Sequence, residues 1–361
     1  MKKLLIFHQA LAPYRVDFFN HLAERFNTEL VLFDTNLVNQ KFDQDRLIGK
    51  LKCRVSYLLR GFRWKDRYFR TGAIRKVLRE RPDIVLGCEY SLVTIALAVY
   101  RFVFRAKFKL YTMTDDNEFQ FRARKGLKSV LRWLFVRLMD GIVVTNEAVR
   151  QAYEAITPKH ARVRYHVVPI LHDEDKMRKD AESIIRAGQE WRRRHLSGFE
   201  KAALFVGRLD EVKNVIWLAR QFANHRDVAL VVVGGGPQWE ELREIVSAEK
   251  LSNVFLVGRK EGREVYEMMS MADVLVLPSC FEPYGAVIGE ALQWGTPCVV
   301  SDRVGAKDII NEKNGAVFKC GDSGDFATSL RRALHLKHSN DSLVADELNK
   351  AVLPLLDSME V

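Results

Sequence analysis

Short apolar runs alternate with longer amphipathic stretches along the first half of the chain. Apolar runs bounded by polar residues predict buried strands, at Leu4–His8, Glu29–Phe33, Asp83–Cys88, Lys109–Thr114 and Gly141–Thr145. Apolar residues at helical spacing predict helices between several of these strands, at Arg15–Phe26, Leu92–Phe104 and Phe119–Met139. This alternation indicates a parallel sheet covered by helices.

The second half repeats the pattern. Strands are predicted at Ala203–Val206, Val228–Val233, Val254–Val257, Asp273–Pro278 and Cys298–Ser301. Helices are predicted at Asn214–Phe222, Trp239–Lys250, Arg263–Met271, Val287–Trp294 and Phe326–His335. The fold class is therefore α/β, with two Rossmann-like parallel-sheet domains. Because parallel sheets bind ligands beyond the carboxyl ends of their strands, we expect the two domains to face a central cleft.

The domain boundaries follow from charge and length, since 361 residues exceed one ordinary core. We expect a first domain at 1–171 and a charge-dense linker at 172–199 with a helical insert, Asp173–Leu196. A second domain at 200–340 precedes a C-terminal amphipathic helix, Ser342–Leu356, within 341–361.

The composition, with 48% hydrophobic and 29% charged residues, is typical of a soluble protein, and we expect no signal peptide. The longest apolar stretch, Leu92–Phe104, contains Arg101 and is too short to span a bilayer. Five scattered cysteines without a C-x-x-C pair argue against a disulfide framework or a zinc site. They favour the reducing cytoplasm.

The net charge of +11 is unevenly distributed. Residues 1–171 hold 32 Lys and Arg against 16 Asp and Glu, whereas residues 172–361 hold 25 against 30. Two segments stand out: Arg60–Arg70, where cations alternate with aromatic residues, and a helix carrying Lys125, Lys128 and Arg132 beside an apolar stripe. Both favour an anionic membrane surface. A solvated basic surface and ordinary core packing of the stripe remain alternatives. Nucleic acid is disfavoured, because no helix-turn-helix, RNP or zinc pattern occurs.

Three short motifs follow predicted strands of the second half. Gly207–Asn214 contains Arg208 and Lys213, which can both reach one anionic group; Gly234–Pro237 is glycine-rich; and Arg259 follows Gly258. Each motif alone is also compatible with a plain strand–turn–helix connection. A fourth segment, Pro278–Leu292, is more specific: a loop with Glu282, a glycine that opens a helix at Gly285, and Glu290 about a turn inside it. Free backbone amides at Gly285–Ile288 would bind an anion at the helix start.

These motifs resemble those of a known family. Glu282 through Glu290 is similar to the E-x7-E motif of retaining glycosyltransferases of the GT-B fold, specifically family 4. Gly207-Arg208 with Lys213 resembles that family's G-R-L-x-x-x-K loop, and Ala291–Ser301 resembles its continuation. The resemblance covers most of residues 200–320.

The resemblance implies a role for each matching residue. Arg208 and Lys213 would neutralise the leaving diphosphate, Glu282 would contact the transferred sugar, and Glu290 would bind the donor ribose. The other donor-binding positions are Gly207, Arg259, Tyr284, Gly285, Ala286 and Val287. It also implies hexosyl transfer with retained configuration, no protein nucleophile, no cofactor and no metal.

The first half departs from the family pattern. His8–Arg15 replaces the usual glycine-rich loop and resembles a variant in surface-polysaccharide transferases, which places Pro13, Tyr14 and Arg15 on the acceptor side. A histidine usual after the fourth strand is absent. Asp115 or Asp116 would take its place, or the pair would cap the helix from Phe119 onward.

We therefore expect an enzyme that moves a sugar from a nucleotide-diphosphate donor to a glycan acceptor. The acceptor would be linked to a polyprenyl diphosphate in surface polysaccharide synthesis, at the cytoplasmic side of the inner membrane. The alternatives are a GT-B epimerase or phosphorylase, or a non-catalytic nucleotide-sugar-binding protein. An oxidoreductase and a P-loop enzyme are disfavoured, because neither glycine motif occurs.

Overall fold

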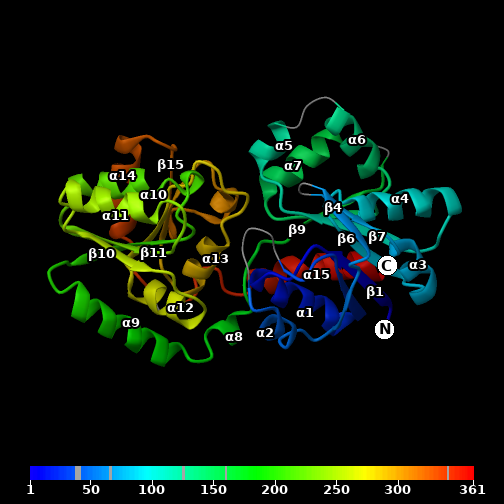
Figure 1. Ribbon diagram of the computed structural model, residues 1–361, viewed down its shortest axis with the longest axis horizontal. Coiled ribbons are helices and arrows are strands. Elements are labelled where there is room, and N and C mark those ends of the chain that lie inside the picture. The colour runs from blue at the N-terminus through cyan, green and yellow to red at the C-terminus, as the bar shows by residue number, and fades with distance from the viewer. Residues whose placement is uncertain (37–41, 65–66, 124–126, 159–160, 340) are drawn as a thin grey trace. The chain divides into compact units, whose positions relative to one another are not determined.

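The computed structural model describes residues 1–36, 42–64, 67–123, 127–158, 161–339 and 341–361. Its contacts divide the chain into two compact units (Figure 1). The first unit comprises Met1–Leu171 together with Glu347–Val361, and the second comprises His172–Asp346.

Within the described residues, the first unit contains a seven-stranded parallel sheet in the order β3-β2-β1-β6-β7-β8-β9. Its strands are β1 (Lys3–His8), β2 (Asn27–Leu32), β3 (Arg54–Tyr57), β6 (Ile84–Cys88), β7 (Lys109–Thr114), β8 (Gly141–Val144) and β9 (Arg164–Val167). The direction in which strands are added reverses at β1, which pairs with β2 on one side and with β6 on the other. The predicted strands are present, and the sheet gains β3 and β9 at its edges.

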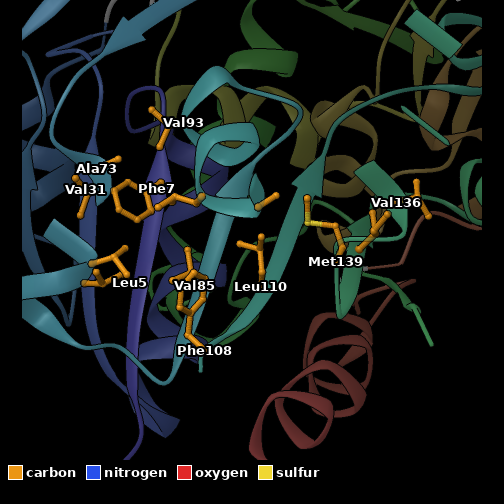
Figure 2. Packing of buried hydrophobic residues seen from close by; sticks show 14 of the residues in the cluster. Leu5, Phe7, Val31, Ala73, Val85, Val93, Phe108, Leu110, Val136 and Met139 are labelled. Carbon is orange, nitrogen blue, oxygen red and sulfur yellow. The ribbon is translucent and has the colours of Figure 1, made fainter. Parts of the chain in front are cut away.

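The core of the first unit lies between this sheet and helices α3 (Ala73–Glu80), α4 (Leu92–Phe104) and α7 (Glu147–Ile156) (Figure 2). Leu5 and Phe7 of β1 pack there with Val85 of β6 and Leu110 of β7. Every residue from Leu4 to Phe7 is fully buried. A central parallel strand is covered on both faces, which explains why its sequence is continuously apolar.

Helices α1 (Val16–Arg25) and α15 (Glu347–Glu360) pack against each other elsewhere in the first unit. Arg25 Nε donates to Glu360 Oε1 at 2.6 Å, and Tyr111 Oη donates to the Ser358 carbonyl at 2.9 Å. The predicted C-terminal helix is therefore present a few residues later than expected, and it joins the first unit. The remaining helical segments of this unit are η1 (Pro13–Arg15), α2 (Gln44–Ile48), α5 (Glu118–Ala123) and α6 (Leu127–Val136).

The aromatic and basic segment Arg60–Arg70 contains an antiparallel hairpin. Strands β4 (Gly61–Trp64) and β5 (Arg67–Arg70) pair so that Phe62 lies opposite Phe69, with stacked rings 4.7 Å apart. Arg70 holds the hairpin by donating from Nε to the Phe33 carbonyl at 2.9 Å. The side chains of residues 63–68 lie outside the described part of the chain.

Arg132 on α6 is buried, so its predicted place on an exposed basic face is wrong. Its Nη2 atom donates to Asp116 Oδ2 at 3.0 Å, and its guanidinium lies 4.4 Å from the centroid of the Phe121 ring. Val130 and Leu134 are exposed instead, at 52% and 45%. Lys125 and the side chain of Lys128, the other predicted basic positions, fall outside the described residues.

The second unit, described apart from residue 340, has a six-stranded parallel sheet in the order β12-β11-β10-β13-β14-β15. Its strands are β10 (Lys201–Val206), β11 (Val228–Val233), β12 (Val254–Gly258), β13 (Val274–Leu277), β14 (Cys298–Ser301) and β15 (Gly315–Phe318). Figure 1 shows helices on both faces of the sheet. The helices described in this unit are α8 (Glu174–Met177), α9 (Ala181–His195), α10 (Val215–Gln221), α11 (Trp239–Ala248), α12 (Arg263–Met271), α13 (Ala286–Gln293) and α14 (Ser323–Leu334), with the short segments η2 (Glu211–Lys213), η3 (Phe222–Asn224) and η4 (Gly305–Ile309). The prediction of two parallel-sheet α/β domains is thus confirmed.

Residues 172–199, predicted as a linker with a helical insert, carry α8 and α9 and belong to the second unit. Helix α9 packs closely on α12: Arg192 Nη1 donates to the Met271 carbonyl at 2.8 Å. A Cβ atom on Gly188 would lie 2.4 Å from the Glu267 carbonyl oxygen, so the two helices are in backbone contact there. Among the described helices, none combines the length and apolarity needed to cross a membrane.

Candidate functional site

The four motifs of the second half all follow strands of one sheet. Strand β10 lies between β11 and β13, so the loop from Gly207 to Lys213 has the glycine run Gly234–Gly236 on one side and Pro278–Gly285 on the other. Gly258 ends β12, one strand further out, and Arg259 follows it. The sheet order thus gathers at one edge what the sequence separates, as open parallel sheets do at their ligand sites.

The glycine run lets two of these loops touch through their backbones. Gly234 has a φ of 154°, and a Cβ atom there would lie 1.9 Å from the Gly207 carbonyl oxygen. Leu209 N donates to the Gly235 carbonyl at 3.1 Å, which joins the loops further. The run therefore serves close packing of the Gly207–Leu209 loop.

Asp210 organises the cations of this loop. Its carboxylate accepts from Arg208 Nε at 2.6 Å and from the Lys213 backbone amide at 3.2 Å, which caps η2. Arg208 remains 54% exposed. The Lys213 side chain is less exposed, at 20%.

Lys213 Nζ forms an ion pair with Glu282, a residue 69 positions away. The Glu282 side chain is only 11% exposed. Its backbone is fixed by a bridge to Val304 and by its carbonyl, which accepts from Gly305 N at 3.1 Å. The structure thus brings together two of the residues predicted to be catalytic, one after β10 and one after β13.

Helix α13 begins immediately after this loop. Its N-cap, Gly285, has a φ of 92°, a left-handed conformation that favours glycine. The first amides of the helix, at Ala286 and Val287, have no acceptor among the described residues, as is usual at a helix N-terminus. The Ile288 amide was predicted to be free as well, but it donates to the Gly285 carbonyl at 3.0 Å. Tyr284 is buried, and its carbonyl accepts from Ala306 N at 2.7 Å.

Glu290 contacts a residue that the sequence analysis missed. His172 Nε2 lies 3.1 Å from Glu290 Oε1, although the two residues are 118 positions apart. Gln293, on the same helix, donates from Nε2 to the His172 carbonyl at 2.7 Å and accepts from its amide at 3.2 Å. The first residue of the second unit is thereby attached to α13. No sequence signal links His172 to Glu290, because neither spacing nor periodicity reports such a distant contact.

Arg259 lies apart from the Lys213–Glu282 pair. It is ion-paired with Glu261 and its side chain is 63% exposed. The nearest motif is the glycine run, since a Cβ atom on Gly235 would lie 4.0 Å from the Arg259 Cβ. Arg259 therefore borders the turn after β11.

In the first unit, the predicted acceptor-side residues Pro13, Tyr14 and Arg15 form η1, in the loop that follows β1. Arg15 is 4% exposed and is ion-paired with Asp115, which follows β7. Burial, together with the nearby Asp115 carboxylate, raises the pKa of the Tyr14 hydroxyl to about 12. Burial also lowers the pKa of the nearby His8 imidazole to about 4, with the Arg15 charge acting in the same direction.

The structure separates the two aspartates of this region. Asp116 is 3% exposed and accepts from Arg132 at 3.0 Å and from Tyr153 Oη at 3.3 Å. The Asp115 side chain is 33% exposed. Asp116 thus belongs to the core of the unit, and Asp115 is the aspartate that a ligand can reach.

This chain has the fold of known GT-B glycosyltransferases. Anabaena HepE in complex with UDP aligns with a TM-score of 0.74 over 99% of this chain and 100% of that chain, at 16% identity. The lipopolysaccharide outer core galactosyltransferase WaaB, in its apo form, aligns with a TM-score of 0.67 over 99% of this chain and 98% of that chain, also at 16% identity. At this identity the likeness defines the fold.

A family match then concerns the second unit. Residues 188–347 match the family described as glycosyl transferases group 1. An uncharacterized glycosyltransferase of Methanocaldococcus jannaschii is 36% identical over 121 residues, which cover 32% of this chain and 31% of that protein. The chain thus spans about a third of the length of this curated relative. These matches support a glycosyltransferase of group 1.

Proposed function

We propose that this chain is a retaining glycosyltransferase of family 4 that transfers a hexose from a nucleotide-diphosphate sugar to a glycan acceptor. The observation that carries the proposal is the contact between Lys213 and Glu282 at adjacent strand ends, immediately before the open amides of α13. A cation, a carboxylate and a helix start together suit a donor that has a diphosphate joined to a sugar.

The diphosphate would be held by charges of the second unit alone. Arg208 and Lys213 would approach its oxygens, and the amides of Ala286 and Val287 would donate to them at the positive end of α13. As the sugar–phosphate bond breaks, negative charge grows on the leaving oxygen, so these fixed donors stabilise the transition state more than the ground state. We propose on this basis that no metal or other cofactor is needed.

The two glutamates would accept hydrogen bonds from hydroxyl groups on either side of the diphosphate. Glu282 would accept from hydroxyls of the transferred sugar once Lys213 turns to the phosphate, and Glu290 would accept from the ribose. Gly207, Tyr284 and Gly285 would shape the intervening backbone, and Arg259 would border the nucleobase. This division follows the roles that the resemblance to the E-x7-E pattern implies.

Retention of configuration would follow a front-face route. No protein nucleophile is proposed; the departing phosphate would accept the proton of the acceptor hydroxyl, while the sugar passes through an oxocarbenium-like state. Asp115, partly exposed beside Arg15, would act on the reacting sugar or acceptor hydroxyl. Pro13, Tyr14 and Arg15 would line the acceptor side of the first unit.

The acceptor would be a polyprenyl-diphosphate-linked glycan in surface polysaccharide synthesis, reached at the cytoplasmic surface of the inner membrane. WaaB, a lipopolysaccharide outer core galactosyltransferase, shares the fold. The end of α4 exposes Phe102, Val103 and Phe104 at 72%, 61% and 70%, next to the exposed cations Arg105 and Lys107. Exposed aromatic and basic residues in a positively charged unit suit an anionic bilayer.

The direct test is a thermal-shift screen of the full chain with UDP-, GDP-, ADP- and dTDP-sugars. A donor at about 100 times its Kd should add about 2.7 kcal/mol to the free energy of unfolding. The matched control is the nucleoside monophosphate of the donor that gives the largest shift, which lacks the second phosphate. If neither a nucleotide sugar nor a nucleoside diphosphate raises Tm, the proposal fails. Proton NMR of the product's anomeric centre then tests retention, and activity in EDTA tests metal independence.

A further inference from the structure

Two cysteines that are distant in sequence meet at the carboxyl ends of the second sheet. Cys280 follows β13 and Cys320 follows β15, and the intervening strand is β14. Their Sγ atoms lie 3.2 Å apart, although the residues are 40 positions apart. The sheet order therefore creates this contact.

Backbone interactions hold both cysteines in place independently of their sulfur atoms. Cys280 N donates to the Val212 carbonyl at 2.8 Å, which ties it to the loop after β10. Cys320 N donates to Asp302 Oδ1 at 2.9 Å, and Asp302 N donates to the Phe318 carbonyl at 2.7 Å. The short distance between the sulfur atoms is thus a property of the folded strand ends.

The two thiols differ in environment, and the pair differs from the other cysteines. Cys280 is exposed, whereas Cys320 is partly buried. Burial, together with the contact with Cys280, raises the pKa of the Cys320 thiol to about 12. Cys88 and Cys298 are buried in the two cores and Cys53 is partly buried. Reactivity of thiols requires access and a thiolate, so Cys280 is the one that reacts first with a reagent in solution.

We propose that Cys280 and Cys320 form an oxidation-sensitive dithiol site, which a low-molecular-weight disulfide such as oxidised glutathione converts to a protein disulfide. The Cys280 thiolate attacks one sulfur of the reagent, forms a mixed disulfide and releases one glutathione thiolate. Cys320 then loses its proton, attacks the Cys280 sulfur and releases the second glutathione. The protein loses two electrons and two protons, and one oxidised glutathione becomes two reduced ones.

The disulfide would restrain the loop that carries Glu282, two residues after Cys280. This consequence rests on the proposed function, because Lys213 must exchange Glu282 for phosphate when the donor binds. We expect the cross-linked protein to transfer sugar several-fold more slowly, with full recovery after dithiothreitol. Since reducing compartments keep such pairs as thiols, the site would respond only to oxidative conditions.

The chemical test is independent of any transferase activity. The full chain is equilibrated in glutathione buffers of increasing oxidised fraction, free thiols are blocked with an alkylating reagent in denaturant, and peptides are identified by mass spectrometry. We expect a Cys280–Cys320 linked peptide, with Cys53, Cys88 and Cys298 alkylated. Cys320→Ser should stop at a stable mixed disulfide on Cys280, and Cys280→Ser should form neither product. Cys53→Ser is the matched control and should behave as the wild type.

Glutathione retained on Cys280 of the wild type without a linked peptide would overturn the proposal, as would a link between other cysteines. Circular dichroism of each variant establishes that it is folded. The cross-link should also raise Tm, because it lowers the conformational entropy of the unfolded chain. If the linked peptide forms but turnover is unchanged, the dithiol site stands and its effect on the donor loop is wrong. If no nucleotide sugar binds under any condition, the proposed function fails and the dithiol result is unaffected.

Discussion

The two units share a Rossmann-like sheet but use charge differently at the ends of their strands. In the first unit the Arg132 and Asp116 side chains are 5% and 3% exposed, surrounded by aromatic rings. In the second unit the Lys213 and Glu282 side chains are 20% and 11% exposed, next to open helix amides. A buried pair cannot give up its partner without leaving an isolated charge, whereas a partly open pair can exchange its partner for a ligand. Similar ion pairs on similar folds thus indicate a structural role in the first unit and support the binding role that we propose in the second.

The family match agrees with this contrast. It covers residues 188–347, nearly all of which belong to the second unit, and leaves the strands of the first unit outside. Function resides in sites built on a fold, and one fold supports many sites. We therefore expect donor chemistry to depend on the second unit and acceptor choice on the first.

The largest expected effect on stability is in the first unit. Asp116→Ala leaves Arg132 buried without its carboxylate and should lower the free energy of unfolding by about 3–5 kcal/mol. Replacing both partners, with Asp116→Ala and Arg132→Met, should restore part of that loss, because no buried charge then remains. Chemical denaturation measures both variants. Arg150→Ala, which removes two partly exposed ion pairs on α7, is the control and should cost about 1 kcal/mol or less. Equal losses for Asp116→Ala and Arg150→Ala would show that burial of the first pair is not what matters.

The largest expected effect on catalysis is in the second unit. Lys213→Ala should lower kcat by about 10²-fold or more, the scale of losing one transition-state donor, while Tm changes little. The control is Arg220→Ala, which removes an exposed cation paired with Glu249 on the same unit. Turnover at the wild-type rate with saturating donor would exclude Lys213 from the reaction and remove the contrast with Arg132.

The sequence predicts the central strands and the site motifs, but not the contacts between distant residues. Central strands were predictable because both faces are buried: Val228–Val233 and Lys109–Thr114 have the bounds expected from their apolar runs. The edge strand β3, Arg-Val-Ser-Tyr, was missed because its partly exposed residues give no apolar run. The site motifs were predictable because each follows a strand. Their pairing was not: Arg132 meets Asp116, and His172 meets Glu290, through tertiary contacts that no local pattern records.

The two glutamates should separate kinetically within the second unit. Glu282→Ala should mainly lower kcat, because this residue is proposed beside the reacting sugar. Glu290→Ala should mainly weaken the binding of free nucleoside diphosphate, by about tenfold, measured by calorimetry. His172→Phe removes the contact with Glu290 and should weaken the same binding by less, whereas His172→Gln keeps a donor and should restore it. Equal loss of nucleotide binding in Glu282→Ala and Glu290→Ala would contradict the division of roles.

The smallest expected effects per residue concern attachment of the first unit to membranes. Each cation near an anionic surface contributes about 1 kcal/mol, which falls off within a Debye length. The predicted positions Arg63, Lys65, Arg67 and Lys128 have side chains outside the described residues, and Arg132 is unsuitable because its loss would destabilise the core. The described alternative is the end of α4, so the variant to test is Phe102→Ser with Phe104→Ser, Arg105→Gln and Lys107→Gln. Arg226→Gln with Arg331→Gln is the matched control, because it removes two exposed cations from the second unit.

In co-sedimentation with anionic and zwitterionic vesicles, the wild type and the control should bind anionic vesicles more strongly at low salt, and the α4 variant should lose that binding. Binding that ignores lipid charge, salt and the α4 substitutions would make a soluble acceptor the better proposal, and the basic charge of the first unit would need another explanation.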